Sequence, residues 1–313
     1  MLALSIVVFL IVLAIPALPA IFELRKPRDA ERLGVYEAYK REPRYFGQSF
    51  RRKLAPAIAR VAGGLTASVP VALADIASVE VMPALDLEAH AKRNGVVVAE
   101  RVTLGEGAAV GDCFARNSLV TGPEVRARTL ASDGTLVLGD RSSVERWLDA
   151  DGDIVIGDGC SLGQSASTDG ALSLGAGSHF ERVWGRPVRT NGAALAVVTD
   201  AGTRIEGDLV KSGNLVVQPG MEVTGTVKAG GDIRLEPGVR VGGNVIARGR
   251  IVAGGPCEIA GNVFAEGPIE LGCGTIVGRA DSFKTVYSAR RITLGPGVTV
   301  HGWIISEEPG VTA

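Results

Sequence analysis

The chain has 313 residues, of which 46% are apolar, 42 are glycine and only 5% are aromatic. A core of this composition must be built from Val, Ile, Leu and Ala, which favours a slender, regularly stacked architecture over a globule packed around large rings. The net charge of −1 argues against a dedicated nucleic-acid binder, which would carry a basic surplus on its folded body.

Residues 1–22, MLALSIVVFLIVLAIPALPAIF, contain no charged side chain. As a helix they would extend about 33 Å, enough to cross the hydrocarbon core of a bilayer, and we predict a transmembrane anchor. A cleaved secretory signal is the alternative. It would need Lys or Arg ahead of the apolar run and an A-x-A-like site after it, and the sequence has neither.

Residues 23–64 form a basic, aromatic-rich juxtamembrane segment that we expect to be partly helical. Residues 23–60 hold eleven Lys/Arg and five Asp/Glu, a net charge of +6, whereas residues 61–313 carry a net charge of −7. Basic residues on this flank alone predict a single-pass protein of the inner (cytoplasmic) membrane, with its body in the cytoplasm. The side chains expected at the membrane surface are Arg25, Lys26, Arg28, Arg51, Arg52 and Lys53.

The aromatic residues of this segment have three interpretations, which do not exclude one another. They could lie at the membrane interface, dock a partner protein, or belong to a short helix at 30–42 and a loop packed on the body. The candidates for partner docking are Tyr36, Tyr39, Tyr45, Phe46 and Phe50. The following residues, 65–100, are predicted to be a connector or an N-terminal cap.

From residue 191 to 306 the chain repeats every eighteen residues. Val223, Val241, Ile259 and Val277 are spaced at that interval, as are the glycines Gly225, Gly243 and Gly261. Apolar pairs two residues apart indicate short strands, and the Gly and Pro-Gly between them indicate corners. The pattern predicts an all-β, single-stranded parallel β-helix with about 18 residues per coil and about eleven coils.

Residues 101–190 carry the same period more loosely, and residues 307–313 form a tail. The winding is interrupted near Arg186–Gly202, and five extra residues separate Leu271 from Leu294. The second insertion includes DSFKTVYSARR, which we expect to project as a loop and to offer Phe283 and Tyr287 to a partner. The period alone suits both left-handed and right-handed helices.

Catalytic and metal-binding residues are sparse. Four cysteines show no C-x-x-C pairing, which indicates small apolar residues in a reduced compartment. His90, His179 and His301 are too far apart along the stack to share a zinc ion. We predict no catalytic residue, cofactor or metal. The enzymatic alternative is a hexapeptide-type acyltransferase with His179 as its base.

A second alternative is a carbohydrate-binding β-helix. Trp147 and Trp184 each follow a Glu-Arg pair, in VERWLDA and FERVWGR, at similar places two coils apart. Arg146, Arg182 and the two indoles could then form a ligand edge. The simpler interpretation is a solvated charged edge with two packing tryptophans.

The unit V-x-G-[NDT]-[VI]-x-A-x-G-x-[IV] resembles the bactofilins, a bacterial family of polymer-forming cytoskeletal proteins. The matching stretches are VTGTVKAGGDIRL, VGGNVIARGRIVA and IAGNVFAEGPIEL, preceded by IEGDLVKSGNLVV. The resemblance covers residues 203–280 well and 102–190 less closely. It implies a right-handed helix that assembles end to end, without nucleotide, as a scaffold for cell-envelope or shape-determining proteins.

The last coil, VTVHGWIISEEPGVTA, would place an unpaired edge at the end of the stack. We expect Trp303, Ile304 and Ile305 to form the self-association contact there. The sequence therefore predicts a membrane-anchored scaffold whose partners are itself, the inner membrane and envelope or division proteins.

Overall fold

The computed structural model describes residues 42–73, 76–192 and 203–313. The chain divides into two units, Met1–Glu42 and Pro43–Ala313, and the second holds nearly all the described residues. The expected anchor at 1–22 lies outside the described residues, together with Tyr36, Tyr39, Arg25, Lys26 and Arg28. No helix within the described ranges is long and apolar enough to cross a membrane.

Unit Pro43–Ala313 is a parallel β-solenoid of about 12 turns with about 18 residues per turn, and one helix, α4 (Tyr45–Ala62), is described beside it. The predicted all-β parallel β-helix and its period of about 18 residues are therefore confirmed, with about 12 turns in place of the eleven expected. Each turn has three sides, called sides 1, 2 and 3 in chain order, and equivalent sides of successive turns pair in parallel.

The N-terminal arm of the solenoid contains the turns from β2 to β11. Most of its pairings join residues 17 apart, such as Val79 with Val96, and the offset becomes 18 between β6 and β8. This shorter turn explains why the repeat is hard to see here. The strands are β2 (Ile76–Leu87), β3 (Lys92–Leu104), β4 (Ala109–Thr121), β5 (Arg126–Ser132), β6 (Thr135–Leu138), β7 (Ser143–Ala150), β8 (Ile154–Ile156), β9 (Ser165–Thr168), β10 (Leu172–Leu174) and β11 (His179–Thr190).

The C-terminal arm keeps an offset of 18 until the predicted insertion, where Leu271 pairs with Leu294. The insertion does not all project. Lys284–Ser288 form a strand, and a bridge between Arg279 and Ser282 closes a short turn before it. The strands are β12 (Arg204–Ile205), β13 (Leu209–Lys211), β14 (Leu215–Val217), β15 (Glu222–Val223), β16 (Val227–Ala229), β17 (Ile233–Leu235), β18 (Arg240–Val241), β19 (Val245–Ala247), β20 (Ile251–Ala253), β21 (Glu258–Ile259), β22 (Val263–Ala265), β23 (Ile269–Leu271), β24 (Ile276–Val277), β25 (Lys284–Ser288), β26 (Ile292–Leu294) and β27 (Thr299–Thr312).

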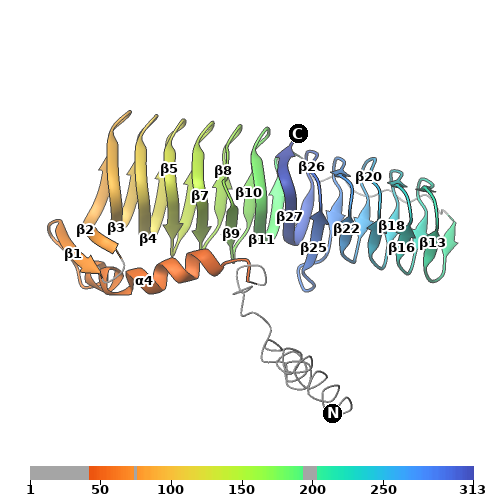
Figure 1. The fold of residues 1–313 in the computed structure, drawn as a ribbon, viewed down its shortest axis with the longest axis horizontal. Coiled ribbons are helices and arrows are strands. Elements are labelled where there is room, and N and C mark those ends of the chain that lie inside the picture. Colours follow the sequence, from red (N-terminus) through yellow and green to blue (C-terminus); the bar gives the residue numbers. More distant parts are fainter. Residues whose placement is uncertain (1–41, 74–75, 193–202) are drawn as a thin grey trace, which may run out of the picture. The chain divides into compact units, whose positions relative to one another are not determined.

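The two arms meet at the last coil of each. Strand β27 pairs antiparallel with β11, so that Val183 faces Ile304 and Trp184 faces Trp303. Figure 1 shows β27 beside β11, with β13 at the far end of the C-terminal arm. The expectation that Trp303, Ile304 and Ile305 form an open end is wrong, because the N-terminal arm already pairs with that edge.

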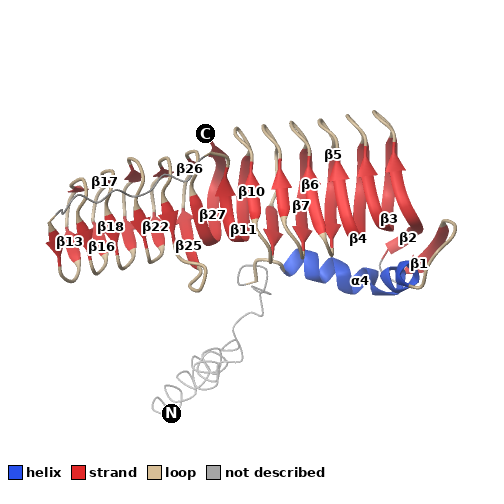
Figure 2. Ribbon diagram, turned by 180° about the vertical axis from the view of Figure 1, so that it is seen from behind, coloured by secondary structure: helices blue, strands red, loops and turns tan. Residues whose placement is uncertain are grey.

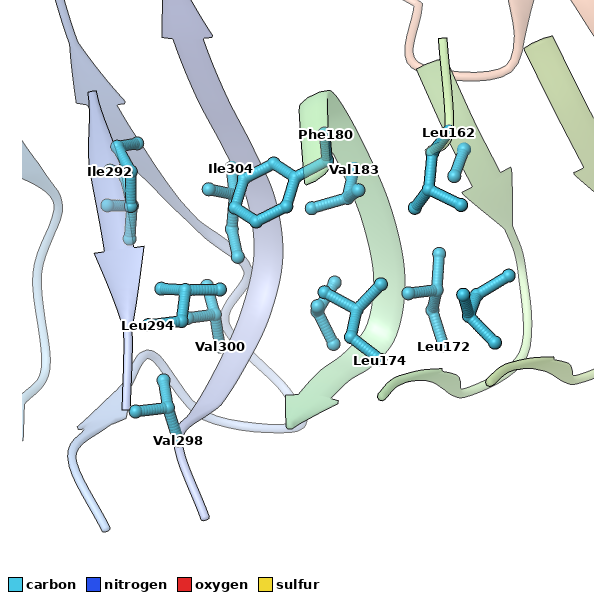
Figure 3. Packing of buried hydrophobic residues seen from close by; sticks show 14 of the residues in the cluster. Leu162, Leu172, Leu174, Phe180, Val183, Ile292, Leu294, Val298, Val300 and Ile304 are labelled. Carbon is cyan, nitrogen blue, oxygen red and sulfur yellow. The ribbon is translucent and has the colours of Figure 1, made fainter. Parts of the chain in front are cut away.

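One apolar core runs through both arms and across this junction. Phe180 and Ile304 come from the two facing strands, and Figure 3 shows their side chains lying against each other between the arms. Both are at most 2% exposed. Burial of the terminal coils against each other removes two apolar coil ends from water, which favours the joined arrangement.

The glycine and asparagine of the repeated V-x-G-N-V have separate structural roles. A Cβ on Gly243 would lie 2.6 Å from the carbonyl carbon of Gly225, one turn earlier, so only glycine fits. The Asn262 side chain accepts a hydrogen bond of 2.9 Å from the backbone N–H of Thr285 in the next turn. The Pro-Gly glycine differs, since Gly238 has φ of +83° and turns a corner.

The solenoid begins earlier than the sequence indicated. Residues 65–100 hold β1 (Val69–Leu73), β2 and most of β3, so the coils start at β2 and not at residue 101. Strand β1 pairs antiparallel with β2 and covers part of the first coil, which agrees with a cap. The described helix spans Tyr45–Ala62 and lies alongside the strands of the N-terminal arm (Figure 2).

Candidate docking face

Side 2 forms a continuous sheet face across both arms, because β11 and β27 meet side 2 to side 2. One row of residues on this face can be followed by strand register through the junction: Val98, Phe114, Ala131, Asp149, Ser167, Trp184 and Trp303. The neighbouring row continues into the C-terminal arm as Arg182, Ile305, Tyr287, Phe264, Ile246, Lys228 and Val210.

Helix α4 covers the N-terminal half of this face, which is called the covered half below. Leu54, Ala57 and Val61 lie on one side of the helix, and all three are buried. They belong to a second apolar cluster together with Phe114 and Trp147 of the sheet. The ring of Phe50 meets the Trp147 indole edge to face, with centroids 5.3 Å apart.

A buried carboxylate fixes the N-terminal end of the helix. Asp149 is 0% exposed and accepts hydrogen bonds from Nε and Nη2 of Arg44, at 3.0 and 2.7 Å, and from the Ser167 hydroxyl at 2.8 Å. Arg51, about two helical turns after Arg44, also donates a hydrogen bond to Asp149. The helix passes so close that a Cβ on Gly47 would overlap the Asp149 side chain.

Three further carboxylates surround these guanidinium groups. Asp151 and Asp169 contact Arg44, and Asp133 accepts a hydrogen bond of 2.7 Å from Arg51 Nε. Burial alone would lower the pKa of Arg44, but hydrogen bonds and the charge of Asp149 outweigh it, so the pKa is raised above its usual value. The pKa of Arg51 is raised for the same reasons. Both arginines are therefore permanent cations that hold α4 on the sheet.

Aromatic side chains gather where the arms meet. Trp184 lies 6.5 Å from Trp303 and 5.7 Å from Phe283 between ring centroids. The Arg186 guanidinium stands over Phe283 at 4.9 Å and over Trp184 at 5.6 Å, and it also reaches Asp169 at 3.5 Å. The insertion loop thus folds onto β11 through Phe283.

The C-terminal half of the face, the open half, is not covered by any described segment. It contains a groove of about 700 Å³ whose floor includes Val210, Ile246, Phe264 and Tyr287, one from each of four strands. Val210 is 65% exposed and Phe264 37% exposed. Charged residues also line the groove: Lys211, Lys228, Arg248 and Glu266.

A smaller hollow of about 470 Å³ lies on side 1 of the C-terminal arm. Its charges alternate in sign, with Arg240 and Glu258 3.3 Å apart. Burial, assisted by the charge of Arg189, lowers the pKa of His301 at its edge, so this ring is neutral at pH 7. Matched charges of this kind form a surface ladder and offer no excess charge to a ligand.

The expected ligand edge is not assembled. Trp147 is buried under α4, whereas Trp184 packs against Trp303 at the junction of the arms and lies in a different row of side 2 from Trp147. Arg146 is exposed on β7, and Arg182 lies opposite Ile305. His179 is an exposed residue of β11 whose backbone pairs with Val311. Within the described part of the chain, no side chain forms a hydrogen bond or ion pair with its imidazole.

The predicted docking and membrane-surface residues have mixed placements. Tyr45, Phe46 and Phe50 lie on α4, and the last two pack against the sheet. Arg51 is an ion-pair partner of the solenoid, whereas Arg52 and Lys53 are exposed. Phe283 packs at the junction, and Tyr287 lies in the groove. All four cysteines are free thiols.

The groove and the Asp149 cluster are the features that sequence reasoning missed. The signal for the groove was present, because Val210, Ile246 and Phe264 are apolar at outward positions of the eighteen-residue frame. The acidic residues were visible as well, but nothing in the local pattern paired them with arginines about a hundred residues earlier.

The fold defines the protein as a two-armed parallel β-solenoid whose side 2 is a continuous sheet face, covered by α4 in the N-terminal arm. No known protein family, curated protein or solved structure matches the chain. Within the described ranges, no group of three or more His, Cys, Asp and Glu side chains could hold a metal ion.

Proposed function

We propose that this protein is a membrane-anchored scaffold of the bactofilin type, with its solenoid on the cytoplasmic face of the inner membrane. The apolar residues 1–22 and the basic residues after them support the anchor and its orientation. The repeat motif and the parallel 18-residue turns support the kinship and, with it, a right-handed winding. In this role the solenoid associates with itself and binds envelope or division proteins.

The observation that carries the proposal is an unpaired coil edge at the far end of the C-terminal arm. Strands β12, β13 and β14 pair on one side, with β15, β16 and β17, and no other described strand pairs with them. A free parallel edge of this kind is a ready template for another chain. The antiparallel contact of β11 with β27 is an example, within the same protein, of two coil ends joined directly.

The hydrogen-bonding groups of β14 show how the edge is exposed. The backbone N–H of Leu215 donates to the carbonyl oxygen of Asp232 at 2.8 Å, and the carbonyl oxygen of Val217 accepts from the backbone N–H of Glu236 at 3.0 Å. Both bonds point toward the interior of the arm. Since alternate residues of a strand point opposite ways, the N–H and C=O of Val216 point outward from the stack. A second copy could pair there without disturbing any bond of the arm.

The opposite end of the solenoid is partly closed, because β1 pairs with β2 over Val69–Leu73. The first product of assembly is therefore a symmetric pair of chains joined at β12–β14. Longer filaments need the remaining part of the β2 edge, from Ala84 to Leu87, as a second contact.

The test is sedimentation velocity and electron microscopy on the full-length chain in detergent micelles, beside Val216→Pro and Val216→Thr. Proline removes the outward N–H but no bond within the arm, and threonine keeps that N–H. We expect pairs or longer assemblies for the parent chain and Val216→Thr, and single chains for Val216→Pro. Single chains in all three samples would contradict the proposal. A reporter active only in the cytoplasm, fused after Ala313, tests the orientation.

A further inference from the structure

We propose that the groove on the open half of side 2 binds an amphipathic helix of a partner protein whose apolar stripe is flanked by carboxylates. The inference deepens the proposed scaffold role by stating the chemistry of the docked partner, and it does not depend on self-association. It rests on the geometry of the face, on its exposed apolar row and on its charge.

The geometry favours a helix because the same sheet face already binds one. Helix α4 has 18 residues and lies on side 2 of the N-terminal arm, where β3, β2 and β7 are its main contacts. The groove is lined by five strands, β13, β16, β19, β22 and β25, one from each of five successive turns. At about 4.8 Å per strand these span roughly 19 Å, which corresponds to a helix of about 13 residues.

The apolar row, with Val210 and Phe264 exposed and the other two members half-buried, provides the hydrophobic contact. Val210, Ile246, Phe264 and Tyr287 lie in register on successive turns, interrupted only by Lys228. In the covered half, the corresponding surface holds Phe114 and Trp147 against the buried side of α4. A row of this length without a cover is typical of an interaction surface.

The charge of the groove selects among possible helices. Lys211, Lys228 and Arg248 are exposed cations, and within the described residues none of them has an ion-pair partner; Glu266 alone has the opposite sign. Elsewhere on this arm, arginines do have partners in acidic residues, as Arg234 has in Glu236 at 2.6 Å. The covered half has the opposite polarity, with Asp133, Asp149, Asp151 and Asp169 binding a basic helix.

This polarity makes α4 and the basic residues around it poor ligands for the groove. Helix α4 is already engaged, and its exposed side carries Arg52, Lys53 and Arg60, which the basic groove would repel in a second copy. Residues 23–60 as a whole have a net charge of +6. An acidic flank on a partner's helix is complementary, and complementarity of this kind determines partner choice.

The test measures binding of two designed helical peptides to the full-length chain in nanodiscs by fluorescence anisotropy. Each peptide has about 16 residues and an apolar stripe at i, i+3, i+4 and i+7, flanked by Glu in one and by Lys in its twin. We expect the Glu peptide to bind at least about tenfold more tightly, with a difference that shrinks as salt is raised.

Variants of the chain locate the site. Ile246→Ser combined with Phe264→Ser should abolish binding, and Lys228→Glu combined with Arg248→Glu should reverse the preference for Glu over Lys. The matched controls are Val155→Ser, an exposed valine of β8 in the N-terminal arm, and Arg291→Glu, the same charge change outside the groove. Both should bind like the parent chain. Val216→Pro, which blocks the proposed self-association, should also bind normally, so the two proposals can fail separately.

Three results would overturn the inference. One is equal affinity for the two peptides, or binding unaffected by the groove variants. The second is a photo-crosslinker placed at Ile246 in the purified chain that attaches to residues 1–41 or to another copy. The third is binding of anionic lipid vesicles that is lost in the Lys228→Glu, Arg248→Glu variant, which would assign the groove to a membrane surface.

Discussion

The attachment of α4 depends on one buried carboxylate, and Asp149→Asn should release the helix. In the parent protein, Asp149 is 0% exposed and accepts two hydrogen bonds from Arg44, one from Arg51 and one from Ser167. The asparagine keeps the volume but removes the charge, and its amide hydrogens would face two guanidinium groups. Loss of one partner of a buried ion pair costs about 3–5 kcal/mol.

The lower end of that range applies here, because Arg44 keeps Asp151 and Asp169, and Arg51 keeps Asp133. A loss of about 3 kcal/mol corresponds to a change of about a hundredfold in the undocking equilibrium. Since the solenoid core does not include α4, we expect the helix to open while the coils remain folded.

Hydrogen exchange with mass spectrometry measures this directly. Amides of Tyr45–Ala62 should exchange about a hundredfold faster in Asp149→Asn, while β16–β23 remain as protected as in the parent chain. Glu270→Gln is the control, because Glu270 forms a half-exposed pair with Arg250 at 3.9 Å that contributes at most about 1 kcal/mol. Unchanged exchange of α4 in Asp149→Asn would refute the assignment of Asp149 as its anchor.

Three further predictions follow from individual contacts. Three of the four cysteines are buried, and burial raises the pKa of their thiols: to about 12 for Cys113, to about 11 for Cys257 and above the usual value for Cys160. Only the exposed Cys273 should therefore be alkylated quickly at pH 8. Rapid labelling of a second cysteine in the folded chain would contradict this. Hydrogen bonds from Arg93 and Ser68 lower the pKa of Glu80, so its stabilisation of the β1–β2 hairpin is complete above about pH 4.5 and is lost as pH falls through the lowered value. The protection of the β1 amides, measured against their intrinsic exchange rate at each pH, should fall there in the parent chain and not in Glu80→Gln. Gly243→Ala should destabilise the solenoid by about 1–3 kcal/mol because its Cβ would meet the Gly225 backbone, whereas Gly213→Ala, with no atom within 4 Å of the new Cβ, should leave the thermal midpoint nearly unchanged.

The sequence by itself determined the repeating unit of this protein. Val223, Val241 and Ile259 occupy equivalent buried places on successive turns, and Leu271 pairs with Leu294 across the five-residue insertion as the spacing required. This success has a physical reason. In a solenoid each turn contacts only its neighbours, so the period of short strands and corners is recorded within about two turns of sequence.

The junction and the covered half were decided only by the tertiary structure. The eighteen-residue pattern predicts how turns stack, but it is the same in both directions along the stack. It therefore cannot show that β27 meets β11 and buries Ile304. The sequence suggested instead that Ile304 lies at an open end of the stack. Likewise, Arg44 and Asp149 are 105 residues apart, and no local propensity relates them. These contacts depend on which apolar coil end and which sheet face are available in the folded chain, and that is a property of the whole arrangement.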